Sequence, residues 1–210
     1  MGGNTMRVFK YVLMFILIAS TLALAGCGGD KFAGKWYAIN DNQRSISMLD
    51  ITKNGENYII KDKSIYYKAD YKEVGKAIGE REGYRSPFDL RKVKYQFEIP
   101  VYEVTLNLFV ENNHQSTQVE TKGQLGEYTY IEKDKTLQGM NSMGKVITYK
   151  QGDVKDLIKK IHNATAAYYD KAKAGEVHIS VKGIGEWSGA TPGNKIKDYK
   201  FNENIPKDLE

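Results

Sequence analysis

The sequence predicts a mostly β protein with antiparallel strands and one long helix near its C-terminus. Short runs in which apolar and polar residues alternate recur along the middle of the chain, and turn residues separate them. One long amphipathic run follows these segments. Eight or nine short strands at this spacing are typical of a sandwich or a closed barrel.

The clearest strand alternates Tyr102, Val104 and Leu106 with polar residues, which predicts one face on a core and one toward water. Asn54-Gly55 is a strong hairpin signal, because both central residues of a type I′ turn need positive φ. The expected strands are 35–39, 45–53, 57–62, 64–68, 93–99, 101–111, 117–122, 127–133 and 146–150. Later turns are expected at Asn112-Asn113, at 133–135 and at 141–144.

A helix of about twenty residues is expected to begin after Asp153, which is a good N-cap, and to end before Gly175. Its apolar stripe should pack on the sheet, and this stripe comprises Val154, Leu157, Ile158, Ile161, Thr165, Tyr168 and Ala172. A second, short helix is predicted at 71–82, because Asp70 and Glu73 have the spacing of a capping box.

The N-terminus has the order of a secretory signal. Arg7 and Lys10 form a charged leader, and an uncharged apolar segment from Val12 to Ala25 follows it. Leu24-Ala25-Gly26-Cys27 resembles the lipobox of bacterial lipoproteins, and it contains the only cysteine of the chain. The resemblance implies cleavage before Cys27 and a lipid on its thiol, which would hold the protein at the exported face of a cell membrane or outer membrane. The alternative is an ordinary signal peptide with a free or buried Cys27.

Removal of residues 1–26 takes away two basic residues and no acidic one, so the net charge falls from +5 to +3. Most basic residues are lysines, whereas nucleic-acid sites favour arginine. The charge therefore predicts a solvated surface with weak attraction to anionic polymers or lipids, and no nucleic-acid partner. The expected organisation is a lipidated Cys27 with a tether to residue 33, a domain over 34–182, and a turn-rich tail over 183–210.

Gly34-Lys35-Trp36 enters the first expected strand and resembles the Gly-x-Trp signature of lipocalins and related barrels. About eight strands, a long helix and a short strand at 176–182 follow it in the lipocalin order. The resemblance implies an up-and-down barrel that Trp36 closes at its base, with the long helix packed outside and a cavity for a small apolar or amphipathic molecule. The family's arginine over the tryptophan has no counterpart, and Lys182 would replace it.

Residues with obvious chemistry are few. The three histidines, His114, His162 and His178, lack the spacing of metal ligands, and the lone cysteine is committed to lipid. The carboxylate pairs Glu80/Glu82 and Glu132/Asp134 are better explained as exposed charges. The sequence thus predicts no catalytic residue, no metal and no cofactor.

Tyrosine is abundant, and it suits both packing and ligand contact because it joins a large apolar ring to a polar tip. The candidate cavity-lining residues are Tyr66, Tyr128, Tyr130 and Tyr149. The first hypothesis for function is a membrane-anchored, lipocalin-like protein that binds a small apolar or amphipathic ligand or a lipid. The alternative is a protein-binding module with a filled barrel, whose partner is an envelope protein, a host factor or an enzyme to be inhibited. An enzyme ranks third.

Overall fold

The computed structural model describes residues 30–86, 88–141, 144–177, 179, 181, 194–202, 204–206 and 209. The chain divides into two compact units. The barrel unit comprises Met1–Trp36, Leu49–Lys61 and Gln115–Gln151, and the helix unit comprises Tyr37–Met48, Asp62–His114 and Gly152–Glu210. Lipidation of Cys27 and the contact expected of Lys182 concern residues outside the described ranges.

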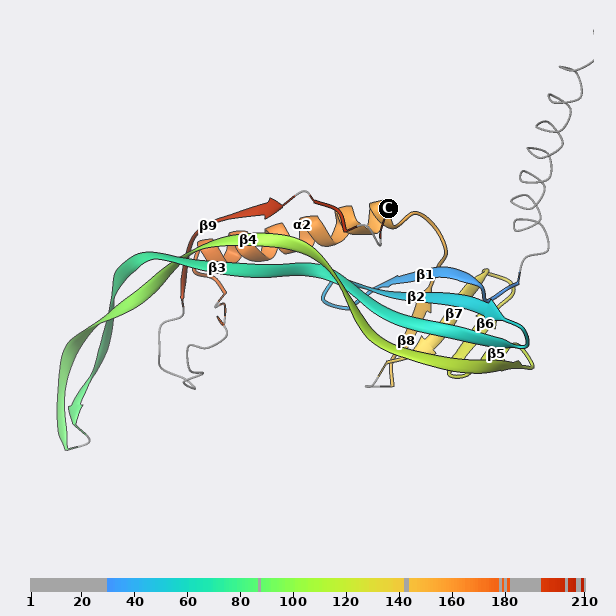
Figure 1. Cartoon of the computed structure of the whole chain (residues 1–210). Coiled ribbons are helices and arrows are strands. Elements are labelled where there is room, and N and C mark those ends of the chain that lie inside the picture. Colours follow the sequence, from blue (N-terminus) through green and yellow to red (C-terminus); the bar gives the residue numbers. More distant parts are fainter. Residues whose placement is uncertain are drawn as a thin grey trace, which may run out of the picture. The chain divides into compact units, whose positions relative to one another are not determined.

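Eight strands pair in chain order, which is the up-and-down order, and they form a nearly closed antiparallel barrel. One helix, α2 (Val154–Lys173), follows the barrel, so the predicted fold class is confirmed (Figure 1). A ninth strand, β9 (Lys195–Asn202), pairs in parallel with β4. The eight strands are β1 (Gly34–Ile39), β2 (Ser45–Asn54), β3 (Asn57–Ser86), β4 (Asp89–Thr121), β5 (Gln124–Leu125), β6 (Tyr128–Ile131), β7 (Thr136–Met140) and β8 (Val146–Tyr149).

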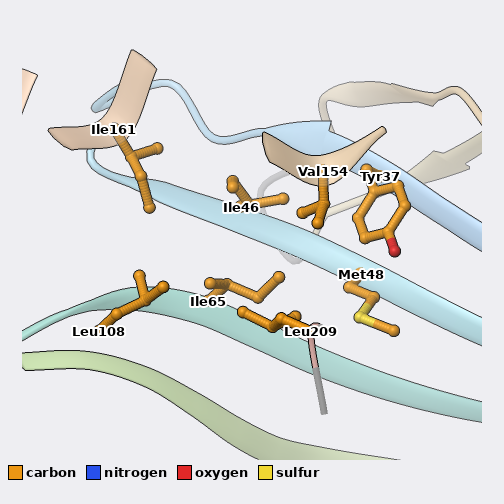
Figure 2. Close-up of a cluster of buried hydrophobic side chains, with 8 residues drawn as sticks. All are labelled: Tyr37, Ile46, Met48, Ile65, Leu108, Val154, Ile161 and Leu209. Carbon is orange, nitrogen blue, oxygen red and sulfur yellow. The ribbon is translucent and has the colours of Figure 1, made fainter. Parts of the chain in front are cut away.

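Helix α2 begins where the sequence predicts. The Asp153 carboxylate accepts a hydrogen bond from the Lys155 amide at 2.8 Å, and Gly175, with φ of 79°, follows the helix. The buried residues are Val154, Ile161, Thr165, Tyr169 and Ala172, so Tyr169 replaces Tyr168 on the inner face. In the helix unit, Val154 and Ile161 pack against residues of β1 to β4 and Leu209 (Figure 2). The apolar stripe is therefore a packing face, as expected.

The helix predicted at 71–82 is wrong, because this segment belongs to β3. Strand β4 supplies partners that a local reading of the sequence does not reveal: Lys76 pairs with Glu98, and Gln96 donates to Glu80 at 3.0 Å. At Gly79, a Cβ atom would collide with the Phe97 ring, so a glycine lets that ring lie across the strand. The capping-box spacing is thus outweighed by cross-strand contacts.

Several expected strand boundaries are also wrong. The expected strands 57–62 and 64–68 are parts of β3, and 93–99, 101–111 and 117–122 are parts of β4. No turn occurs at Asn112-Asn113, because β4 continues through both residues, and the Asn113 side-chain amide Nδ2 donates to Ser64 Oγ of β3 at 2.8 Å. The hairpin between β2 and β3 is present, but positive φ falls on Gly55 and not on Asn54, as in a type II′ turn.

The predicted C-terminal tail is likewise corrected, since it contains β9. Lys197 falls at an irregularity of the β4–β9 register, because Tyr102 pairs with Ile196 and Glu103 with Asp198. This bulge interrupts the alternation between Ile196 and Tyr199 and hides the strand from a period-two search. The strand expected at 176–182 is not observed at residues 176, 177, 179 and 181, the part of it that the structure describes.

Candidate functional site

The barrel unit buries several large side chains of its own. Trp36 is 1% exposed, and Phe32, Leu49, Leu125 and Leu137 are fully buried. The Trp36 indole N–H donates to the Phe32 carbonyl at 2.7 Å, which satisfies its one donor. These buried side chains therefore take up part of the interior in which the lipocalin resemblance places a ligand.

Three of the tyrosines predicted to contact a ligand pack in this unit. Tyr130 makes edge-to-face contacts with Phe32 and Trp36, with ring centroids 6.0 and 6.2 Å apart. Tyr128 and Tyr149 make a similar contact with each other at 6.1 Å. Edge-to-face pairs of this kind stabilise a core, so these three residues have packing partners.

Asp30 fixes the start of the described chain to the barrel unit. Its carboxylate accepts hydrogen bonds from Lys53, Tyr58 and the amides of Phe32 and Ala33. Burial opposes ionisation, but these four donors outweigh it and lower the pKa of Asp30 to about 2. Residues 30–33, assigned to a tether by the sequence, are thus held by the barrel at two points, the Asp30 carboxylate and the buried Phe32 ring.

The helix unit contains an open cavity of about 310 Å³, here called the helix cavity. Segments from four parts of the chain line it: the turn before β2, the paired strands β3 and β4, and one side of α2. The lining residues are Asn42, Arg44, Ser45, Ser64, Tyr66, Tyr67, Glu111, Thr165, Tyr168 and Tyr169. Tyr66 is the only predicted site residue among them.

Two opposite charges line the helix cavity without pairing with each other. The Arg44 guanidinium lies 3.9 Å from the centroid of the Tyr168 ring, a cation–π contact that orients it. The Tyr66 hydroxyl donates to Glu111 at 3.1 Å. Burial, followed by this hydrogen bond, raises the pKa of Tyr66, which keeps the phenol protonated at neutral pH. The cavity therefore offers a cation and an anion, each held by a tyrosine.

Thr165 supplies a polar group that lacks a protein partner. The residue is 4% exposed, and its hydroxyl makes no hydrogen bond in the structure. A buried hydroxyl without a partner costs about 1–3 kcal/mol. Because Thr165 lines the helix cavity, a molecule bound there could satisfy this hydroxyl.

Tyr169 and Tyr67 form the more buried wall of the helix cavity. The hydroxyls of Tyr169 and Tyr71 are 3.0 Å apart, and burial, with this contact, raises the pKa of Tyr169. Burial also raises the pKa of Tyr67, whose ring contacts His162 and Phe201. These tyrosines thus stay neutral and present apolar faces to the cavity.

Comparison with family models, with curated proteins and with solved structures finds no match to this chain. The assignment of a site therefore depends on the geometry of the described residues.

Potential metal ligands do not gather in the described residues. No cluster of three or more His, Cys, Asp or Glu side chains within the described ranges could hold a metal ion. His114 is exposed on β4, and the His162 ring stacks 3.8 Å from that of Phe201. His178 lies outside the described residues. Among the described residues, no helix combines the length and the apolar character needed to cross a bilayer.

Sequence reasoning missed Arg44, Glu111 and Thr165 as site residues. Arg44 precedes an expected strand, Glu111 occupies a water-facing strand position, and Thr165 lies on the packing stripe of the helix. Each therefore has an ordinary local explanation, and only the tertiary fold brings the three to one cavity. One feature of the sequence pointed to a separate role for Arg44, namely its position far from the other arginines of the mature chain.

Proposed function

We propose that this chain is a lipid-anchored lipoprotein of the bacterial envelope that binds a small amphipathic molecule in the helix cavity. The observation that carries the proposal is the convergence of Arg44, Glu111 and the unpartnered Thr165 hydroxyl on one open cavity among tyrosine rings. The lipobox sequence at Leu24 to Cys27 supports the anchor.

The helix cavity suits a ligand better than the barrel interior does. In the barrel unit Trp36, Phe32 and Leu137 are buried, and the rings of Phe32 and Trp36 contact Tyr130. The helix cavity instead combines apolar ring faces with a few convergent polar groups, which is the usual composition of a small-molecule site. The barrel is thus assigned the role of a scaffold.

The lining indicates the chemistry of the ligand. Arg44 would bind an acidic or strongly polar group, Glu111 an ammonium or hydroxyl group, and the tyrosine rings a flat or aliphatic body. A cavity of about 310 Å³ limits the occupant to a small molecule, or to one part of a lipid.

Native mass spectrometry of the chain from Gly28 to Glu210, purified from cells under mild conditions, tests the proposal. This chain retains every residue that the structure describes. We expect a stoichiometric small molecule on the wild-type protein and its loss from the variants Arg44→Gln and Glu111→Gln. Arg81→Gln and Glu127→Gln, which change the same residue types at exposed positions away from the cavity lining, are the matched controls.

A protein that is folded but always empty would overturn the ligand proposal and leave the protein-binding alternative. The anchor is tested separately. Cys27→Ser should release the protein from membrane fractions with its fold intact, whereas continued retention in those fractions would contradict lipidation.

A further inference from the structure

The paired strands β3 and β4 extend beyond the part of the helix unit that α2 and β9 cover (Figure 1). Strand β9 pairs with β4 only from Val101 to Asn107. From about Val74 to Ile99 the described chain continues as a two-stranded ribbon. The ribbon tip is defined here as residues 81–86 and 88–95.

The ribbon is held by contacts between its own strands. The Phe97 and Ile99 side chains lie against Gly79, and the Tyr95 ring lies against Gly83. The Tyr95 hydroxyl also donates to the Tyr84 carbonyl at 3.0 Å. Rings that lie across strand glycines cover backbone and stabilise a pair of strands that has no third neighbour. The ribbon can therefore present its tip in a defined conformation.

Positive charge is concentrated at the ribbon tip. It carries five basic and two acidic residues, and it contains three of the five arginines of the chain. One acidic residue, Asp89, already pairs with Arg91 at 2.5 Å. Arg85, Lys92 and Lys94 are exposed. The net charge of +3 at the tip equals that of the whole mature chain, so the remainder of the mature chain is close to neutral.

The same tip exposes aromatic side chains. Phe88 is 99% exposed, Tyr84 58% and Tyr95 41%. A large apolar ring at full exposure is unfavourable in water and marks a contact surface when it has neighbours of the same kind. Aromatic rings beside basic groups are the combination found where proteins meet the headgroup region of a bilayer.

We propose that the ribbon tip docks on the surface of an anionic phospholipid bilayer. Arg85, Lys92 and Lys94 would contact the acidic headgroups, and Phe88 would enter the boundary between headgroups and acyl chains, with Tyr84 and Tyr95 at the headgroup level. Charge complementarity selects the anionic surface. The exposed rings favour a bilayer over a soluble polyanion, because a polyanion neutralises the charge but leaves Phe88 in water.

Co-sedimentation with vesicles tests this docking without interference from a lipid anchor when the chain from Gly28 is used. We expect binding to vesicles of phosphatidylglycerol and phosphatidylcholine in equal parts, and weak binding to pure phosphatidylcholine. The triple variant Arg85→Gln, Lys92→Gln, Lys94→Gln should bind the anionic vesicles about a hundredfold more weakly, because each basic residue near such a surface contributes about fivefold. Phe88→Ser should lower binding roughly tenfold by removing the inserting ring.

The matched control removes three charges elsewhere. Lys155→Gln, Lys159→Gln, Lys171→Gln changes exposed lysines of α2 and should bind within twofold of the wild type. Circular dichroism of each variant checks that the fold is retained.

Absence of binding to anionic vesicles by the wild type would overturn the proposal. An equal loss in both triple variants would overturn it too, since the attraction would then be general. Unchanged binding of Phe88→Ser, or full competition by polyphosphate at matched ionic strength, would contradict docking on a bilayer. Either result would indicate that the tip binds a soluble polyanion. None of these results depends on occupancy of the helix cavity.

Discussion

The aromatic residues of the barrel unit and of the helix unit have different roles. In the barrel unit, the Tyr130 ring packs against the rings of Trp36 and Phe32. In the helix unit, Tyr66 and Tyr168 instead hold the charged groups Glu111 and Arg44 at the edge of an open cavity. Aromatic residues thus form ring contacts in one unit, whereas in the other the polar tip and the ring face of tyrosine position charged groups.

The largest effect is expected at the centre of the barrel unit. Trp36→Ala should lower the free energy of unfolding by about 3–5 kcal/mol, because it leaves a cavity and removes the ring contacts with Tyr130. Urea denaturation measures the change. The control is Val146→Ala, because this side chain is 57% exposed. It should lower the free energy of unfolding far less. Equal losses in the two variants would contradict a tightly filled interior.

A smaller loss is expected in the ribbon of the helix unit. Gly79→Val should force the Phe97 ring off the strand and cost about 1–3 kcal/mol, the usual range for overpacking. Limited proteolysis should then cut the ribbon faster, while the barrel unit stays protected. Ile78→Val, at a position that is 65% exposed, should leave the cleavage rate unchanged. Slow cleavage of both variants would show that the ring does not cover Gly79.

Acid should weaken the barrel unit through Asp30. Its pKa of about 2 lies below the ordinary value of 3.8, so the ionised group stabilises the fold above pH 4, and this contribution is lost as the pH falls from about 4 to 2. Asp30→Asn should lower the free energy of unfolding by about 2 kcal/mol at pH 7. The variant's free energy of unfolding should also depend less on pH between about 4 and 2. Urea midpoints from pH 2 to 7 provide the measurement. Parallel curves for wild type and variant would refute the role of Asp30.

The smallest change in stability is expected at the helix cavity, and there the substitution should stabilise the protein. Thr165→Val removes a buried hydroxyl that lacks a partner, so the ligand-free protein should gain about 1 kcal/mol of stability. Thermal unfolding of the ligand-free protein detects the gain. Bound ligand should stabilise the variant less than the wild type, because the hydroxyl is no longer available to it. A destabilised ligand-free variant would indicate that the hydroxyl already has a partner.

The sequence predicts best what local patterns determine. The alternation along 101–111 and the Asp153 cap suffice to locate part of β4 and the start of α2. The sequence does not predict the structure where a partner strand determines it: within 71–82, Gly79 suits a ribbon because β4 places the Phe97 ring over it. It fails at β9 because the irregularity at Lys197 breaks the period.

The candidate site was predictable only in part, for a similar reason. Tyr66 could be selected because tyrosine suits a cavity wall. Arg44, Glu111 and Thr165 are far apart in the sequence, and each has an unremarkable local pattern. Their meeting depends on the packing of α2 against the paired strands β3 and β4, which a single sequence does not reveal.

NMR tests directly the proposal that a ligand occupies the helix cavity and not the barrel. The isotope-labelled chain from Gly28 would be titrated with 1-anilinonaphthalene-8-sulfonate, a small aromatic anion that has the predicted amphipathic character. Saturable shifts of the resonances of Arg44, Tyr66 and Thr165 are expected. Shifts confined to Leu49, Leu125 and Leu137 would place the ligand in the barrel and contradict this proposal.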